Sequence, residues 1–132
     1  FKVDAHGLFC PGVFGMARSS SPDSANSQFY LMTGRNEGLN GIYTAFGRIV
    51  SGLDVVRALK PGAESQDGAV TDPDVMTRVR MASAMPAGEA PVVRVQDVRG
   101  AAFAQTLADA RAAKGSAFNI CDVQPAAEVS GA

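Results

Sequence analysis

The sequence has few of the side chains on which most catalytic and metal sites depend. His6 is the only histidine, and Cys10 and Cys121 are the only cysteines. His6 and Cys10 could supply two metal ligands, but no acidic or sulfur partner has the spacing of a metal site. We therefore predict no metal site, and we interpret His6 as a polar residue near the end of a strand.

Two cysteines allow one disulfide at most. Sequence alone does not show whether the two side chains meet. Both could instead be small buried apolar residues, and an even number of cysteines is only weak support for a bond. Both interpretations therefore stay open at this point.

Net charge and long apolar runs are also scarce. The 132 residues carry a formal net charge of −1, which steers the chain toward neither nucleic acid nor an anionic membrane. No apolar run approaches the roughly 20 residues of a transmembrane helix. We expect no nucleic-acid partner and no membrane span. The hydrophobic share of 46% is that of a folded protein, either one domain or part of a larger one.

Short alternating segments dominate the first part of the chain. Residues 13–17, 28–32 and 43–49 are predicted strands, and each places its large apolar side chains on one face. Those side chains are Phe14, Met16, Phe29, Leu31 and Phe46, whereas the opposite faces carry Ala17, Gln28, Tyr30 and Tyr43. The serine-rich residues 19–27 are expected to form an ordered connection, because an apolar strand follows directly. Residues 75–81 alternate in the same way and predict a fourth strand.

A helix is expected to begin at Ser51. Its hydroxyl can cap the first turn, with Asp54 at the capping-box position. Leu53, Val56 and Leu59 form a core-facing stripe, and the pair Pro61-Gly62 ends the helix.

The residues after Pro86 form a separate C-terminal extension. Residues 92–98 predict a strand, 100–114 a helix that Gly115 ends, and 117–123 a further strand. Residues 124–132 are expected to fray. We therefore divide the chain into a β-rich antiparallel body, residues 1–86, and a small α/β extension, residues 87–132.

One long, irregular pattern resembles a known family. Met16-Ala17-Arg18, a serine-rich loop, then Ser27-Gln28-Phe29-Tyr30 and, downstream, Thr44 to Ile49 resemble the second half of a cyclophilin-type peptidyl-prolyl cis/trans isomerase. The resemblance covers about residues 1–84. The family fold is a closed eight-stranded antiparallel β-barrel capped by two helices. The resemblance implies that this chain supplies the last four barrel strands and the second capping helix. The strand-like start at Phe1-Lys2-Val3 agrees with an absent first half.

The resemblance implies six site residues. Gln28 matches a glutamine that binds the substrate backbone, and Tyr30 stands where a phenylalanine usually forms the floor of the proline pocket. Leu39 matches the pocket wall, Tyr43 stands where many bacterial members have tyrosine, and Ala17 with Arg18 matches the segment that pairs with the bound peptide. Gln28 and Tyr30 are thus the implied catalytic residues, and the other four bind substrate. Taken singly, Gln28 could be a solvated strand residue and Tyr30 a half-buried aromatic.

The resemblance also implies an activity. Rotation about an Xaa-Pro amide makes and breaks no covalent bond, so it needs no cofactor. The family's catalytic arginine lies in an upstream Phe-His-Arg strand that this chain lacks. We therefore expect part of an isomerase that assists protein folding, acts on proline-containing peptides or unfolded proteins, and is inactive without its N-terminal half. The alternative is a cyclophilin-like binding or structural module without appreciable catalysis. Tyr30 and Gly38, which stands where many members have an aromatic residue, favour that alternative.

The extension is expected to pack on the body and to leave the proline groove open. Its apolar residues are too many for a solvated tail and too few for a separate core; they are Val93, Val95, Phe103, Leu107, Phe118 and Ile120. Docking would bring Cys121 toward Cys10. Bacterial members of the family with appendages often act on exported proteins, so the resemblance suggests a periplasmic location, with the cytoplasm as the alternative.

Overall fold

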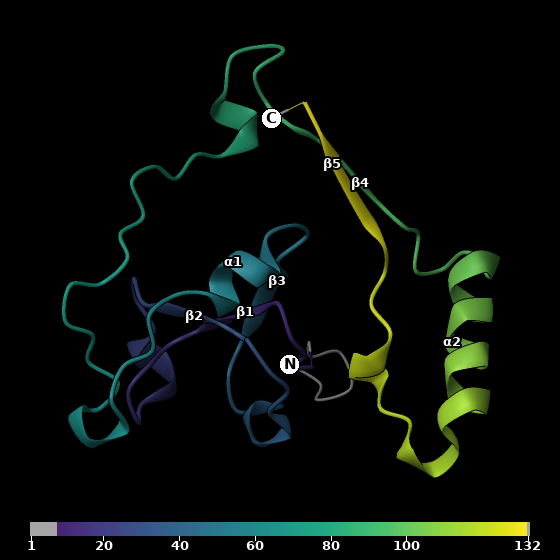
Figure 1. Ribbon diagram of the computed structural model, residues 1–132, viewed down its shortest axis with the longest axis horizontal. Helices are drawn as coiled ribbons and strands as arrows, with labels where there is room; N and C mark the ends of the chain where they lie inside the picture. Colours follow the sequence, from purple (N-terminus) through teal and green to yellow (C-terminus); the bar gives the residue numbers. More distant parts are fainter. Residues whose placement is uncertain (1–7, 132) are drawn as a thin grey trace.

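The computed structural model describes residues 8–131, so the expectations for Phe1-Lys2-Val3 and for His6 lie outside the described residues. Three strands form one antiparallel sheet in the order β2-β1-β3 (Figure 1). They are β1 (Val13–Met16), β2 (Phe29–Leu31) and β3 (Ala45–Arg48). All three predicted strands of the body's first half are confirmed, each slightly shorter than expected.

The large apolar side chains of this sheet share one face, as predicted. The Phe14 ring lies 5.9 Å from the Phe29 ring and 5.7 Å from the Phe46 ring, measured between centroids. Phe29 is nevertheless 43% exposed and Phe46 55% exposed. The three rings therefore contact one another, but residues 8–131 leave the face that they form only partly covered.

The buried core of the body is correspondingly small. Among residues 8–131, only Phe9, 1% exposed, and Met32, 9% exposed, are buried apolar side chains. The strands of the described chain form an open sheet and not a closed barrel. The body thus contains an antiparallel sheet whose two edges, β2 and β3, are open.

Helix α1 (Leu53–Arg57) begins later than the sequence predicted. Gly52 is its N-cap, at a φ of 82°, and no side chain caps the helix, so the predicted cap by Ser51 is wrong. Ser51 lies one residue too early to reach the first free N–H groups. Arg57 donates two hydrogen bonds, of 3.1 and 2.9 Å, to the carbonyl of Thr33 after β2, which fixes the helix to the sheet. Leu59, beyond the helix, is 48% exposed, so the predicted core-facing stripe is reduced to Leu53 and Val56, which are half-buried.

The predicted strand at residues 75–81 is wrong. These residues are extended but belong to no strand, and the apolar side chains on both of their faces are exposed. Val75 is 76% exposed and Val79 is 78% exposed. A strand requires a neighbour that pairs with its N–H and C=O groups, and no described strand lies beside this segment.

The extension contains the predicted helix, the first of its two predicted strands in a shorter form, and one strand that was not predicted. Helix α2 (Ala101–Lys114) ends at Gly115, whose φ is 53°. Strand β4 (Val92–Val95) pairs antiparallel with β5 (Ala127–Ser130), so the tail that was expected to fray forms a ribbon. The strand predicted at residues 117–123 is wrong, because that stretch folds into two short 3₁₀ turns, Gly115–Ala117 and Ile120–Asp122.

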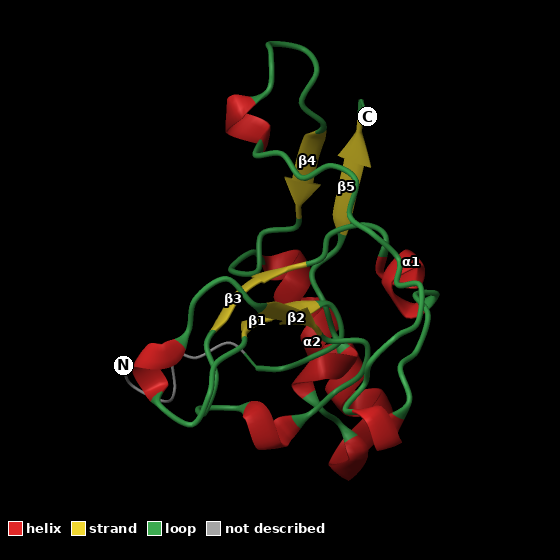
Figure 2. Ribbon diagram, turned by 90° about the vertical axis from the view of Figure 1, so that its left-hand side faces the viewer, coloured by secondary structure: helices red, strands yellow, loops and turns green. Residues whose placement is uncertain are grey.

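Docking of the extension is confirmed for one of its segments. Arg48 of β3 donates a 2.7 Å hydrogen bond to the carbonyl of Pro125, and Gln124 donates one of 2.8 Å to the carbonyl of Pro11. Both views show the β4–β5 ribbon projecting away from the three-stranded sheet (Figures 1 and 2). Val93 and Val95 on that ribbon are 46% and 50% exposed and Ile120 is 37% exposed, so the predicted burial of these three side chains is wrong.

A disulfide joins the extension to the body. It links Cys10 to Cys121, with a Cα–Cα distance of 5.1 Å. The predicted approach of Cys121 to Cys10 is therefore confirmed, and the alternative of two unpaired buried thiols is excluded.

None of the helices in residues 8–131 has the length and apolar character that crossing a bilayer requires.

Candidate functional site

A pocket of about 290 Å³ opens beside the three-stranded sheet. Its lining consists of five of the six residues identified from the sequence: Ala17, Arg18, Tyr30, Leu39 and Tyr43. They come from the end of β1, from β2, from the 3₁₀ turn Glu37–Leu39 and from the residues before β3. The structure thus gathers residues from four separate segments into one hollow, and no residue of the extension lines it.

Tyr30 is held on three sides. The Phe9 ring stacks on it with 5.8 Å between centroids, and the Tyr43 ring meets it edge-on at 6.0 Å. On the third side its ring crosses Gly15, its partner in the β1–β2 register. A Cβ atom at Gly15 would overlap the Tyr30 ring and hydroxyl. The absence of a side chain at residue 15 therefore allows Tyr30 to lie flat across β1.

The Tyr30 hydroxyl is buried and has no hydrogen-bond partner among the described residues. Burial raises the pKa of Tyr30 above its ordinary value of 10.0, the neighbouring Tyr43 raises it further, and Arg18 acts in the opposite direction. The phenol is therefore neutral near pH 7. The Tyr30 ring is thus an apolar surface with an uncharged hydroxyl at its end, which suits contact with an uncharged ligand ring.

Arg18 and Tyr43 form one wall of the pocket. The Arg18 guanidinium lies over the Tyr43 ring, 4.8 Å from its centroid. It also donates hydrogen bonds of 2.9 Å to the carbonyls of Ser19 and Ile42. These contacts link the serine-rich loop to the segment before β3, and they hold the Arg18 side chain in place as part of the pocket wall.

Leu39 reaches the pocket from a well-ordered turn. Asn36 caps the turn, because its Oδ1 accepts a 3.0 Å hydrogen bond from the Gly38 N–H. The Leu39 carbonyl accepts bonds of 3.2 and 3.1 Å from the N–H groups of Ile42 and Tyr43. Leu39 and Tyr43 are therefore positioned together.

Gln28 lies apart from the other five side chains. It is exposed and lines a larger neighbouring hollow of about 1000 Å³, which also contains Ala17 and Tyr30. Its carbonyl accepts a 3.0 Å hydrogen bond from the Ala17 N–H. Gln28 thus stands at the edge of the sheet, where a peptide lying over Ala17 could reach it.

Sequence reasoning missed two residues of the site, Phe9 and Gly15. The strand register would have placed Gly15 opposite Tyr30 once β1 and β2 were aligned. Phe9 precedes the strands in an irregular segment, and no pattern in the sequence indicates its contact with Tyr30. In the part of the chain that the structure describes, no group of three or more His, Cys, Asp or Glu side chains is placed to hold a metal ion.

Comparison with known proteins agrees with the geometry. The sequence model for cyclophilin-type peptidyl-prolyl cis-trans isomerases matches residues 3–81, more than half of the chain. A probable peptidyl-prolyl cis-trans isomerase of Brucella abortus is 52% identical over 66 residues, which is 50% of this chain and 34% of that protein. The rhodopsin-specific isozyme of Calliphora vicina is 36% identical over 66 residues, 50% of this chain and 28% of that protein.

A solved structure has the same fold over nearly the whole chain. The crystal structure of a cyclophilin from Hirschia baltica matches with a TM-score of 0.76 and 28% sequence identity, over 92% of this chain and 43% of that one. The chain belongs to the cyclophilin-type peptidyl-prolyl cis-trans isomerase family. It spans about a third of the length of the Brucella abortus relative.

Proposed function

We propose that this chain is the C-terminal part of a peptidyl-prolyl cis/trans isomerase that assists protein folding. The observation that carries the proposal is the pocket in which Ala17, Arg18, Tyr30, Leu39 and Tyr43 meet. Its substrate would be a proline-containing peptide or an unfolded protein. The division into a body, residues 1–86, and an extension, residues 87–132, is part of the same proposal.

The pocket suits the chemistry of amide rotation. The barrier of about 18–20 kcal/mol comes from resonance in the C–N bond, so catalysis needs a slot that holds the ring while one end of the amide turns. Tyr30 would form the floor of that slot and Leu39 its wall. Gln28 and the backbone of Ala17 would hold the peptide on either side.

A donor aimed at the proline nitrogen would complete the site. As resonance is lost this nitrogen becomes a better acceptor, so a hydrogen bond to it is stronger in the transition state than in the ground state. Arg18 is engaged with Tyr43 and with two carbonyls. We propose that the donor is an arginine from a preceding N-terminal half, as the family resemblance implies.

Three observations support such a missing half. Phe29 and Phe46 on the apolar sheet face are about half exposed. Residues 75–81 have no pairing strand. The Brucella abortus relative is about three times as long as the region that matches it. A complementary set of strands would cover the face, pair with residues 75–81 and close the barrel. On this proposal the present chain alone has no appreciable activity.

The alternative function is binding of proline-containing segments without appreciable catalysis. It is favoured by Tyr30, which places a hydroxyl where the family usually has phenylalanine. Gly38 also leaves the pocket without an aromatic contact beside Leu39. Both residues depart from the family's slot for the proline ring, which rotation of the amide requires, whereas the peptide could still bind along Gln28 and the backbone of Ala17.

We further propose a periplasmic location. The Cys10–Cys121 bond supports it, because disulfides persist in oxidising compartments and are rare in the reducing cytosol. Fractionation of cells that express the full-length protein would test this. Recovery in the cytoplasmic fraction with both thiols free would contradict it.

Two steps test the enzymatic proposal. The coding sequence upstream should contain Phe-His-Arg and Gln-Gly-Gly. The full-length protein should then accelerate isomerisation of an Ala-Pro peptide. A folded full-length protein that binds the peptide without accelerating its isomerisation would establish the binding module instead.

A further inference from the structure

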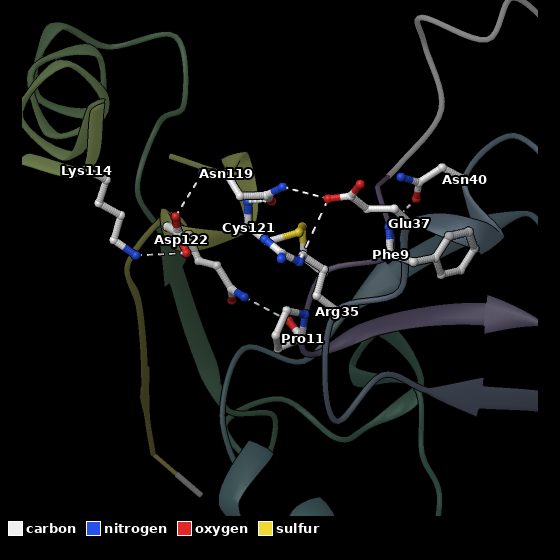
Figure 3. The surroundings of a disulfide bond; sticks show 11 residues. Phe9, Pro11, Arg35, Glu37, Asn40, Lys114, Asn119, Cys121 and Asp122 are labelled. Atoms are coloured by element: carbon white, nitrogen blue, oxygen red, sulfur yellow. Dashed lines mark hydrogen bonds and ion pairs between the residues drawn. A yellow bond between two sulfur atoms is a disulfide. The ribbon is translucent and has the colours of Figure 1, made fainter. Parts of the chain in front are cut away.

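The turn that bears Cys121 contacts two of the segments that position the pocket. We define the extension turn as residues 119–122. Figure 3 shows that it contacts the body at two places. Cys121 is bonded to Cys10, and the Asn119 side chain donates a 2.8 Å hydrogen bond to the Glu37 carboxylate.

The first contact leads to the pocket floor. Cys10 directly follows Phe9, which is 1% exposed and stacks on Tyr30 with 5.8 Å between ring centroids. The disulfide therefore restrains the backbone next to the side chain that supports Tyr30. No other covalent link restrains residues 8–12, because Cys10 and Cys121 are the only cysteines.

The second contact leads to the pocket wall. Glu37 begins the same 3₁₀ turn that Leu39 ends, so Asn119 holds that turn from outside. Hydrogen bonds also connect Phe9 to the residues that flank the turn bearing Leu39. The Phe9 N–H donates a 2.9 Å hydrogen bond to Asn40, and the Phe9 carbonyl accepts one of 3.1 Å from the Asn36 N–H. Phe9 is thus bonded to residues on both sides of Leu39.

The extension turn is stiff enough to transmit these restraints. Asn119 and Asp122 form a reciprocal capping box: the Asn119 Oδ1 accepts a 3.0 Å hydrogen bond from the Cys121 N–H, and the Asp122 carboxylate accepts one of 2.9 Å from the Asn119 N–H. Lys114 at the end of α2 adds an ion pair of 3.0 Å to Asp122. The Asn119 N–H, and then Lys114, lower the pKa of the Asp122 carboxyl, which keeps it ionised at neutral pH.

We propose that the extension turn is a brace that positions the floor and the wall of the proline pocket, and that the Cys10–Cys121 bond holds this brace in place. The inference rests on the proposed function, because it names residues that position the same site. Asn119, Cys121, Glu37 and Phe9 are positioning residues and touch no substrate.

Reduction of the disulfide would release the brace. A dithiol reductant transfers two electrons and two protons to the cysteine pair, which becomes two thiols, while the dithiol closes into its own cyclic disulfide. Phe9 and the turn that carries Leu39 would then be held by hydrogen bonds alone. The pocket would bind the proline ring less well in the ground state and the transition state alike, which raises KM more than it lowers kcat.

The test uses the full-length protein and its kinetics on an Ala-Pro peptide. KM is measured for the oxidised wild type, the dithiothreitol-reduced wild type and the Cys121→Ser variant. It is also measured for Asn119→Ala, Glu37→Ala and their double variant. Glu37→Gln is the conservative variant, since its side-chain oxygen can still accept the bond from Asn119. Glu64→Ala, an exposed glutamate in another turn, is the matched control.

We expect reduction and each of the Cys121, Asn119 and Glu37→Ala changes to raise KM between about twofold and 30-fold. The two changes at Asn119 and Glu37 should be non-additive, Glu37→Gln should keep KM near the wild-type value, and Glu64→Ala should do the same. Thermal unfolding of Asn119→Ala should match the wild type, which separates positioning from loss of fold. An active wild type whose KM is unchanged by all these treatments would overturn the brace. An inactive oxidised wild type would instead overturn the proposed function.

Discussion

At the scale of single residues, the site depends on how Tyr30 is seated. Phe9 lies against one side of its ring, Tyr43 meets it edge-on, and Gly15 leaves room for it across β1. Each support comes from a different segment of the chain. A change at Phe9 or Gly15, neither of which lines the pocket, should therefore move the pocket floor without touching a substrate.

Gly15→Ala should displace Tyr30. The new methyl group would occupy the space of the Tyr30 ring, and such overpacking costs about 1–3 kcal/mol. We predict a lower free energy of unfolding and a lower kcat/KM in the full-length protein. Gly47→Ala is the matched control, because its Cβ would lie an ordinary 4.0 Å from the Cβ of Phe14. Equal behaviour of the two variants would contradict the seating of Tyr30.

Tyr30→Phe should change the pH dependence of stability. Because burial raises the pKa of Tyr30 above 10.0, the folded protein keeps the phenol proton at a pH where the unfolded chain loses it. This contribution to stability is complete below pH 10 and is lost as the pH rises through the raised pKa. The variant should therefore lose less unfolding free energy than the wild type above pH 10, measured by urea denaturation. Parallel losses in the two proteins would show that the Tyr30 hydroxyl is solvated.

Leu39→Ala and Gln28→Ala should each lower kcat/KM for an Ala-Pro peptide. Leu39 would lose pocket wall worth about 1–3 kcal/mol, and Gln28 would lose a backbone hydrogen bond to the peptide of about 1 kcal/mol. Both side chains lie outside the buried core, so circular dichroism should show an intact fold. Unchanged kinetics in both folded variants would show that neither Leu39 nor Gln28 belongs to the substrate site.

At the scale of elements, the sequence pattern predicted the strands and the helix whose formation depends on nearby residues. Strands β1, β2 and β3 follow the alternation of Phe14, Phe29 and Phe46, and α2 ends at the predicted Gly115. Residues 75–81 alternate equally well yet form no strand, since pairing depends on a neighbour that alternation does not supply. At 117–123, the Asn119–Asp122 capping box closes a turn where apolar residues had suggested a strand.

Residues 75–81 should become a strand in the full-length protein. Their side chains are exposed here because no described segment pairs with them. We predict slow amide hydrogen exchange for this segment in the full-length protein and fast exchange in the 132-residue chain, measured by mass spectrometry. The α2 amides, bonded within their own helix, serve as the internal reference. Fast exchange in both proteins would argue against a pairing strand from an N-terminal half.

At the scale of the whole molecule, the family and the pocket were accessible from sequence, whereas the arrangement of the extension was not. The irregular run from Met16 to Tyr30, together with the matching segment that begins at Leu39, identified the family and five of the residues that now line one hollow. The Cys10–Cys121 bond and the β4–β5 pairing join residues separated by 111 and about 35 positions, and no local pattern specifies such contacts. The match to the Hirschia baltica cyclophilin covers 92% of the chain, so it extends beyond the family region into the extension.

The most direct test of the central proposal is complementation of prolyl isomerase activity. The 132-residue chain and a separately produced N-terminal half are assayed alone and after mixing, with an Ala-Pro peptide as substrate. We predict no acceleration by either part, acceleration by the mixture, and a weaker effect when the chain carries Leu39→Ala. A 132-residue chain that is monomeric, unfolds cooperatively and accelerates isomerisation alone would contradict the proposal that its site is completed by another half.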